Sequence, residues 1–244
     1  MLARVLEPET LDHLAPDDPA AQRSRRDLRR VNAIMGARAI LVRALGRVLP
    51  ARQRASLRIL EIGCGDGLLL LDVARRGGIV WGPNVELTLL DRQPIVTAAT
   101  IQAYADAGWA ARTRTADVLD WAGDRLDPAR WDVVVANLFL HHFDGKALAD
   151  LLAGCSRRAD ALVACEPRRS RFALAASHLV VFIGANAVTR RDAVLSVRAG
   201  FAGRELSHAW PDEAGPWRFD EYDDGLFTHC LCGARMGARA EAPR

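Results

Sequence analysis

The chain has 244 residues, 50% of them hydrophobic, and a formal net charge of +3. A chain of this length and composition can bury one large core with small additions, so a separate second domain is not expected. The five cysteines are odd in number and include no C-x-x-C pair, which argues against a disulfide framework and a zinc site. We therefore predict no metal site and a reducing, cytoplasmic location.

The start of the chain is predicted to lie outside the main core. Residues 1–20 contain acids and three prolines in place of a basic and then apolar signal segment, so they imply no secretion and are expected to form a loose leader. Residues 22–49 are predicted to form one amphipathic helix that ends at Pro50, with Ile34 in its apolar stripe. Leader and helical lid together span residues 1–54.

The lid region is strongly basic. Residues 21–54 hold ten arginines and a single acid, Asp27, whereas the rest of the chain has more acidic than basic residues. Such an arm can bind RNA or an anionic surface. The arginines can equally form the solvated face of the amphipathic helix. We favour this second interpretation, because Lys146 is the only lysine in the chain, which indicates a genome-wide preference for arginine and not a phosphate-binding tract.

Apolar runs and helical segments alternate through the middle of the chain. Strands are predicted at residues 57–62, 85–91, 111–116, 131–137 and 161–165, with helices at 68–76, 94–108 and 144–158. This alternation predicts an α/β fold with a doubly wound, Rossmann-like, mostly parallel sheet. Near the end, two strand-like segments at 217–223 and 226–232 flank Asp224-Gly225, which predicts an antiparallel C-terminal hairpin.

The most apolar stretch of the chain, residues 172–188, is interrupted by Ser177, Gly184 and other polar or small residues. It is too short and too broken for a membrane span, and we expect a buried helix or a pocket wall. The domain proper is predicted at 55–235 and the tail at 236–244.

The most informative segment follows the first strand. Residues 58–71 read RILEIGCGDGLLLL, so Gly63, Gly65 and Gly67 fall in a tight strand-to-helix turn, where glycine lets a ligand approach the backbone. A nucleotide-like cofactor is expected there. A dinucleotide fingerprint requires a third glycine where this chain has Leu68, which makes a Rossmann dehydrogenase a poor alternative.

The pattern E-x-G-x-G-x-G resembles motif I of the class I S-adenosylmethionine (SAM) dependent methyltransferases, and the resemblance extends over about three quarters of the chain. It implies that Glu61 holds the methionine ammonium of SAM and that the glycine loop accommodates the methionine part. The cofactor-binding residues that it implies are Glu61, Gly63, Cys64, Gly65, Gly67, Asp91, Arg92, Asp117, Val118 and Asn137.

Two acids outside the glycine turn are also expected to bind the cofactor. Asp91 ends the second strand, where a carboxylate can accept hydrogen bonds from both ribose hydroxyls, or can simply cap the next helix. Asp117 and Val118 resemble the family's third motif, in which the acid binds the adenine amino group and the next backbone N–H binds a ring nitrogen. Asp120 is an alternative, because aspartate is common where strands end.

Residues 137–143 read NLFLHHF and look like motif IV of small-molecule methyltransferases. They lack the Asn/Asp-Pro-Pro-aromatic signature of amino-nitrogen DNA methyltransferases, so nucleic-acid bases are not favoured acceptors. His141 and His142 are the catalytic candidates, because a neutral imidazole can take a proton from a phenol or an acidic carbon. The alternative for either one is packing against the cofactor or capping a helix.

The segments CEPRRS at 165–170, TRRD at 189–192 and DLRRVN at 27–32 resemble a bacterial subgroup of small-molecule methyltransferases associated with type III polyketide synthases. In the wider family the corresponding insertion, about 167–201 here, shapes the acceptor pocket. Arg169 is expected to pair with an anionic acceptor group, and its charge can equally be solvated surface. The substrate-binding candidates are Asn32, Arg169, Phe172 and His178.

The sequence therefore predicts transfer of a methyl group from S-adenosyl-L-methionine to the oxygen or carbon of a small aromatic, phenolic or polyketide-like molecule, with S-adenosyl-L-homocysteine (SAH) as product and oxygen slightly favoured. One alternative is an RNA or protein methyltransferase that uses the arginine-rich helix. Another is a SAM-binding protein without activity. We expect no membrane span and no nucleic acid partner, and a homodimer is left open.

Overall fold

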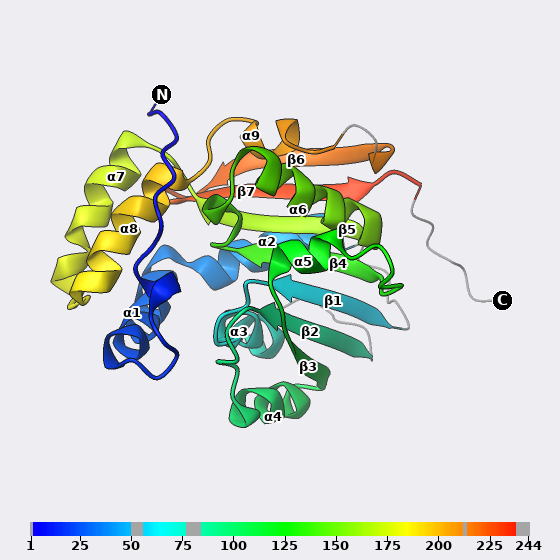
Figure 1. Cartoon of the computed structure of the whole chain (residues 1–244), viewed down its shortest axis with the longest axis horizontal. Coiled ribbons are helices and arrows are strands. Elements are labelled where there is room, and N and C mark those ends of the chain that lie inside the picture. The colour runs from blue at the N-terminus through cyan, green and yellow to red at the C-terminus, as the bar shows by residue number, and fades with distance from the viewer. Residues whose placement is uncertain (1, 50–55, 77–83, 212–213, 238–244) are drawn as a thin grey trace.

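The structure is a computed structural model that describes residues 2–49, 56–76, 84–211 and 214–237. Its centre is a seven-stranded sheet in the order β3-β2-β1-β4-β5-β7-β6 (Figure 1). Neighbouring strands from β1 to β5 are parallel, and β7 runs antiparallel to β5 and β6. This sheet confirms the predicted fold class. The strands are β1 (Leu57–Ile62), β2 (Val85–Asp91), β3 (Trp109–Thr115), β4 (Trp131–Asn137), β5 (Ala159–Pro167), β6 (Trp217–Asp224) and β7 (Thr228–Arg235).

Helices cover both faces of the sheet. Buried side chains of α2, α3 and α4 pack on one face, and those of α5 and α6 pack on the other together with Leu206 of α9. At the edge where the parallel strands end, α1, α7 and α8 form a cap (Figure 1). The helices are α1 (Pro19–Met35), α2 (Ala37–Val48), α3 (Leu68–Arg76), α4 (Ala98–Asp106), α5 (Val118–Gly123), α6 (Gly145–Arg158), α7 (Arg171–Ser177), α8 (Ala187–Ala199) and α9 (Glu205–His208), with 3-10 turns η1 (Leu11–His13), η2 (Leu140–His142) and η3 (His178–Ile183).

Most predicted elements lie where the sequence pattern places them. The bounds of β1, β2, β4 and α3 agree with the prediction, while β3 begins two residues earlier and β5 is longer at both ends. The helix expected from Pro94 begins later, because the Thr97 side chain accepts a hydrogen bond from the Thr100 N–H at 3.1 Å and caps the helix there. Gly225 has φ of +72° in the hairpin turn between β6 and β7.

The single lid helix predicted over residues 22–49 is wrong. Gly36 adopts the left-handed conformation, with φ of +71°, and separates α1 from α2. The apolar stripe is interrupted as well, since Ile34 is 66% exposed. Polar contacts hold α1 in place: Ser24 and Thr189 hydroxyls lie 2.7 Å apart, and Asp27 accepts from the Asn186 N–H at 2.8 Å.

The first residues do not form a loose leader. The Val5 N–H donates to the Arg198 carbonyl at 3.1 Å, and the Arg4 guanidinium donates to the Phe143 carbonyl at 2.8 Å. Further along the same segment, the N–H groups of Thr10 and Leu11 donate to the Asp192 carboxylate. Residues 2–14, to which we restrict the name leader from here on, therefore form an ordered segment that contacts α8 and the segment after β4 (Figure 1).

The apolar stretch 172–188 is not a buried helix. It forms α7, η3 and the start of α8, and Phe172, Leu179 and Phe182 are 57%, 57% and 83% exposed. Within the described residues, none of the helices combines the length and hydrophobicity that a membrane crossing needs. The predicted boundary at 54/55 and the tail from 238 onward lie outside the described residues.

Candidate active site

The carboxyl ends of β1, β2 and β4 meet beneath the cap. The chain passes from β1 to β2 on one side, while β4 lies on the other side of β1, so the strand order reverses between β1 and β4. Open α/β sheets bind ligands at such a switch point. Glu61, next to the end of β1, pairs with Leu89 of β2 and Val135 of β4, which places its side chain at the switch point.

The glycine turn follows directly. Gly63, Gly65 and Gly67 have φ of +64°, +55° and +71°, a region that favours glycine. At Gly63 a Cβ atom would come within 2.1 Å of the Phe139 ring, so glycine is required for the close approach of the segment after β4. The turn is held from the other side by the Tyr104 hydroxyl, which donates to the Gly67 carbonyl at 2.7 Å. Cofactor loop and histidine segment are thus in direct contact.

Glu61 is a buried acid without a partner. Its side chain is 4% exposed, and Oε2 has no hydrogen-bond partner among the described residues. Burial, with added repulsion from Asp66 and Asp91, raises the pKa of Glu61 to about 8. Asn32 of α1 likewise has a buried Oδ1 without a partner in this part of the chain. An unpaired buried carboxylate is costly, and a bound cation would relieve that cost.

Asp91 connects the glycine turn to the end of β2. Its carboxylate accepts from the Gly65 N–H and from the Gln93 N–H, both at 2.9 Å. Burial raises the pKa of Asp91 despite these two bonds. A carboxylate offers about four acceptor positions, so two remain for a ligand. Arg92 is exposed and its guanidinium lies 3.6 Å from the carboxylate of Asp12 in the leader, so its side chain faces the leader.

The remaining cofactor candidates end β3 and β4. Asp117 caps α5 by accepting from the Leu119 N–H at 2.7 Å, and its side chain is exposed. Val118 is buried in the core. Asn137 is half-buried at the end of β4, beside Cys165 of β5 in the ladder. The capping role considered for Asp91 is performed by Thr97, which caps α4. Asp117 caps α5, and its role toward adenine stays a prediction.

Sequence reasoning missed the residue that organises the segment after β4. Glu166 of β5 is fully buried and accepts from the N–H groups of Phe139 and Leu140, at 3.1 and 2.9 Å. It also bonds the His141 ring at Nδ1, at 2.8 Å. Leu138, just before, has φ of +51°, a conformation that a leucine adopts only when its surroundings impose it. An acid inside an apolar strand was the available signal for Glu166.

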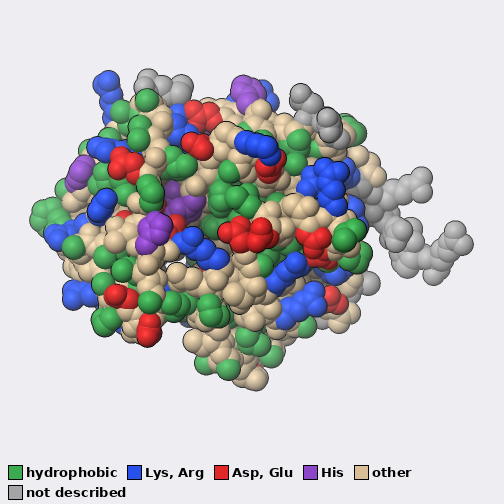
Figure 2. Space-filling model, viewed as in Figure 1, with side chains coloured by type: hydrophobic (Ala, Val, Ile, Leu, Met, Phe, Trp, Pro, Cys, Tyr) green, Lys and Arg blue, Asp and Glu red, His purple; other side chains and the backbone are tan. Residues whose placement is uncertain are grey.

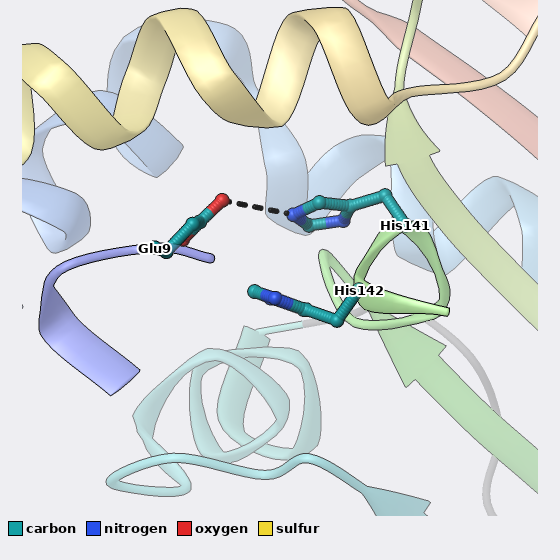
Figure 3. A group of neighbouring side chains, drawn as sticks. All are labelled: Glu9, His141 and His142. Carbon is teal, nitrogen blue, oxygen red and sulfur yellow. Dashed lines mark hydrogen bonds and ion pairs between the residues drawn. The ribbon is translucent and has the colours of Figure 1, made fainter. Parts of the chain in front are cut away.

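His141 and His142 are neighbours near Glu9 (Figure 3), and their pKa values are shifted in opposite directions. His141 is buried between two carboxylates: Nδ1 faces Glu166, and Nε2 lies 3.3 Å from Glu9 of the leader. Burial alone would lower its pKa, but the hydrogen bonds to Glu166 and Glu9 raise it to about 9. Burial, and next the charge of His141, lower the pKa of His142, whose Nδ1 lies 3.3 Å from Asp12. His142 therefore carries a free lone pair near neutral pH.

The predicted substrate-binding residues do not converge on this place. Arg169 is buried and donates to Glu205 at 3.0 Å and to the Leu2 carbonyl at 2.9 Å, so internal partners occupy its guanidinium. Phe172 is exposed and stacks on Phe227 with ring centroids 5.8 Å apart. His178 is exposed at the start of η3. The expected pairing of Arg169 with an acceptor and the apolar wall are not supported by this arrangement.

Two cavities adjoin the sheet within the described residues. One of about 50 Å³ lies at the cofactor end and is bordered by Cys64, Asp91 and Thr115. A larger one of about 200 Å³ lies at the opposite edge, where the strands begin, and is lined by residues such as Arg58 and Trp131. The larger cavity borders none of the predicted site residues, so we assign no function to it.

Comparison with known proteins agrees with this geometry. Residues 59–160 match the model of a methyltransferase domain. Among solved structures, an O-methyltransferase family protein from Burkholderia thailandensis is similar with 18% identity and a TM-score of 0.60, over 92% of this chain and 62% of that one. SibL, a SAM-dependent methyltransferase in its apo form, has 18% identity and a TM-score of 0.60, over 95% of this chain and 63% of that one.

The plantazolicin methyltransferase BpumL in complex with SAH is similar over 90% of this chain and 91% of that one, with 13% identity and a TM-score of 0.58. No curated protein matches. Residues 59–160 thus resemble a methyltransferase domain, and the chain has the fold of these solved methyltransferases. BpumL was solved with SAH, so SAM is the cofactor against which the residues of this site are compared. The residues fit that cofactor: a partnerless buried carboxylate suits an ammonium group, and Asp91 retains acceptor positions for hydroxyls.

Proposed function

We propose that the protein transfers a methyl group from SAM to an oxygen, or a carbon, of a small aromatic, phenolic or polyketide-like acceptor. The observation that carries the proposal is the pair formed by Glu61 and Asp91 around the glycine turn. One acid is buried with no partner among the described residues, and the other is already oriented by two backbone N–H groups. This is the arrangement of charge that a cationic, ribose-containing cofactor requires.

We assign roles to the cofactor-binding residues from the hydrogen-bonding positions that each still has available. Glu61 and Asn32 have buried oxygens free for the ammonium group, and Asp91 has free acceptor positions for the ribose hydroxyls. Asp117 and the Val118 N–H remain our candidates for adenine. When bound, SAM supplies an activated methyl group, so the protein's task is mainly to position the acceptor and exclude water.

The closed cap favours a small acceptor. The leader and α1 are fastened over the switch point: Arg29 donates to Asp66 of the glycine turn at 2.7 Å, and Arg25 donates to Gln93 at 2.8 Å. A site covered by such segments suits a small molecule better than a polymer. The sequence resemblance to enzymes associated with polyketide synthases is consistent with an aromatic acceptor.

The acceptor is proposed to lie beside His141 and His142. His142 is close to Phe139, with ring centroids 6.1 Å apart, and Phe139 is packed against Gly63 of the cofactor turn. The lone pair of a neutral His142 can act on the hydroxyl of an acceptor, whereas His141 is occupied by its two carboxylates.

An RNA or protein methyltransferase is the second candidate, based on the arginine-rich segment. Several of these arginines are paired within the molecule: Arg30 with Asp27, Arg43 with Asp224, and Arg47 with Asp220. Arginines and acids are also interspersed over the face in Figure 2, without a continuous basic surface. Both observations favour the small-molecule acceptor.

Calorimetric titration with SAH tests the cofactor site. Wild-type protein is expected to bind one SAH per chain, and Asp91→Ala to weaken binding about 10- to 100-fold, because charge-assisted bonds to the ribose are lost. Asp91→Asn, which keeps the acceptor for the Gly65 N–H, guards against a folding defect. Asp150→Ala, at an exposed position of α6, is the matched control. Equal SAH affinity in all variants would remove Asp91 from the ribose role.

Identification of the acceptor needs an unbiased search. The protein is incubated with SAM carrying a deuterated methyl group and with a small-molecule extract of the source organism, and products are recognised by mass spectrometry from the added label. A labelled phenolic or polyketide-like compound supports the proposal. Labelled RNA or protein would support the second candidate. SAH binding with no labelled product in any fraction would indicate a SAM-binding protein without activity.

A further inference from the structure

Three side chains from two distant parts of the chain converge above the end of β4. Glu9 of the leader, His141 and His142 each offer one ligand atom, and these atoms lie within 4.8 Å of one another (Figure 3). We propose that Glu9, His141 and His142 form a binding site for a divalent transition-metal ion. The proposal rests on the proposed function only in placing this ion beside the acceptor.

Glu166 provides the support that a metal-binding histidine requires. Its carboxylate bonds His141 Nδ1 at 2.8 Å, which leaves Nε2 directed toward Glu9. Glu166 itself is completely buried and is fixed by backbone N–H groups of Phe139 and Leu140. Histidine ligands of metals commonly donate their second ring N–H to a carboxylate in this way, which fixes the tautomer and the ring orientation.

The surroundings favour a cation. Glu9 is held in place by the Ser196 hydroxyl, which donates to the same oxygen that faces His141. Asp12 adds a carboxylate 3.3 Å from His142 Nδ1, so three acids in total surround the two imidazoles when Glu166 is included. A metal ion would lie between His141 Nε2 and the Glu9 carboxylate, whose atoms are 3.3 Å apart. It would balance the same negative charge with direct bonds.

The donor set identifies the class of ion. Two imidazole nitrogens and one or two carboxylate oxygens suit Zn²⁺, Mn²⁺, Fe²⁺ or Co²⁺. Mg²⁺ and Ca²⁺ prefer ligand sets made of oxygen, so they are not expected to bind here with comparable affinity. The described residues provide no thiol to this cluster, which excludes a thiolate site.

The location gives the ion a function. His142 is close to the Phe139 ring, which in turn contacts the cofactor turn at Gly63. With His142 as its ligand, a metal ion at this place would replace that histidine in activating the acceptor: it would bind the acceptor oxygen and lower the pKa of the hydroxyl, so that the proton leaves to solvent. The oxygen then forms the new O–CH₃ bond as the sulfur–methyl bond of SAM breaks, and the electron pair of that bond remains on sulfur. Binding of the acceptor through oxygen would favour transfer to oxygen over carbon.

The direct test measures metal binding by the full chain without any tag. Protein treated with a chelator and dialysed is titrated with Co²⁺, followed by its visible absorption, and with Zn²⁺ by calorimetry. We expect one ion per chain, and about 10- to 100-fold weaker binding by Glu9→Gln, His142→Ala and the supporting variant Glu166→Gln. The matched control, His178→Ala on exposed η3, is expected to bind like wild type.

SAH titration of the same samples separates the two proposals. The metal-free protein and the variants are expected to bind SAH, which also shows that they are folded. Wild-type protein that binds SAH but neither Co²⁺ nor Zn²⁺ up to about millimolar concentration overturns the metal site and leaves the cofactor site intact. Unchanged metal affinity in both Glu9→Gln and His142→Ala overturns it as well, and would make Glu9 and Glu166 ion-pair partners that hold a protonated His141. Loss of SAH binding in wild type would instead refute the proposed function.

Discussion

At the scale of single residues, Glu61 illustrates a conflict between stability and cofactor binding. Its pKa in the folded protein, about 8, lies above the ordinary value of 4.5. The folded state therefore prefers the protonated acid, and relative to a neutral side chain the wild-type protein loses stability as the pH rises from about 4.5 to about 8. The acid is retained at this cost because, on our proposal, it binds the ammonium group of the cofactor.

Glu61→Gln is therefore expected to stabilise the cofactor-free protein by roughly 1–3 kcal/mol near pH 8 and by little near pH 4.5. The same substitution should weaken SAH binding about 10- to 100-fold. Thermal unfolding across this pH range and calorimetry measure the two effects. Glu86→Gln on the exposed side of β2 is the control, with neither effect. A variant that loses stability at pH 8 would contradict the unpaired state of Glu61.

The sequence was sufficient to place Glu61 and Asp91 at the ends of β1 and β2, while their roles toward the cofactor stay predictions. It did not reveal Glu9 or Glu166 as partners of His141, since Glu166 reaches His141 only through the pairing of β4 with β5, and Glu9 only through the path of the leader. Arg169 was misjudged for a related reason: its partner Glu205 lies in a separate helix that no local pattern connects to it.

At the scale of elements, apolar runs located the buried strands well, because a strand covered on both faces has an almost continuous hydrophobic sequence. The prediction of a single lid helix failed because the break between α1 and α2 depends on one residue. Gly36 ends α1 in a conformation that other residues adopt with strain, and α2 then turns onto the face of the sheet. An isolated glycine in a helical pattern does not reveal whether it continues or ends the helix.

A matched pair of substitutions tests that explanation. Gly36→Ala is expected to lower the free energy of unfolding by about 1 kcal/mol, because alanine resists a φ of +71° although there is space for its methyl group. Gly46→Ala, on the exposed side of α2 and equally free of neighbours, should instead raise it by about 0.5–1 kcal/mol. Urea unfolding of both variants provides the measurement. Stabilisation by Gly36→Ala would mean that α1 and α2 form one continuous helix.

The C-terminal hairpin is joined to α9 through a buried histidine. His229 bonds Asp223 at 2.8 Å and Glu221 at 3.0 Å, and Glu221 accepts from two N–H groups at the start of α9. Burial alone would lower the pKa of His229, but the hydrogen bonds to Glu221 and Asp223 raise it. Since the folded value lies above the unfolded one, this stabilisation is complete below about pH 6.5 and is lost as the pH rises through the folded value.

His229→Gln should therefore destabilise the protein more at pH 6 than at pH 9. The gap between the melting temperatures of wild type and variant, measured across this range, is expected to narrow with rising pH. His208→Gln, on the exposed surface of α9, should leave the melting temperature unchanged at every pH. A gap of constant size would show that His229 contributes by packing alone and not by its charge.

At the scale of the whole molecule, the unevenly distributed charges of the sequence pair with each other inside the fold. The arginine-rich segment is laid against the acidic body, and pairs such as Arg38 with Asp72 and Arg43 with Asp224 connect α2 to α3 and to the hairpin. These contacts are partly exposed, so each contributes only about 0.2–1 kcal/mol. Several such contacts connect the basic segment to the rest of the molecule, so its charge has a structural explanation that does not require a nucleic acid partner.

All five cysteines are free thiols and buried, four of them in the core and Cys64 in the glycine turn. The rate at which a thiol-reactive dye labels the protein therefore reports how often the fold opens, since four sulfurs become available only when the sheet separates. Labelling of these four is expected to slow about 100-fold at an SAH concentration of 100 times its Kd. Cys64, 9% exposed, should react first, and its protection by SAH would report occupancy of the loop independently of catalysis.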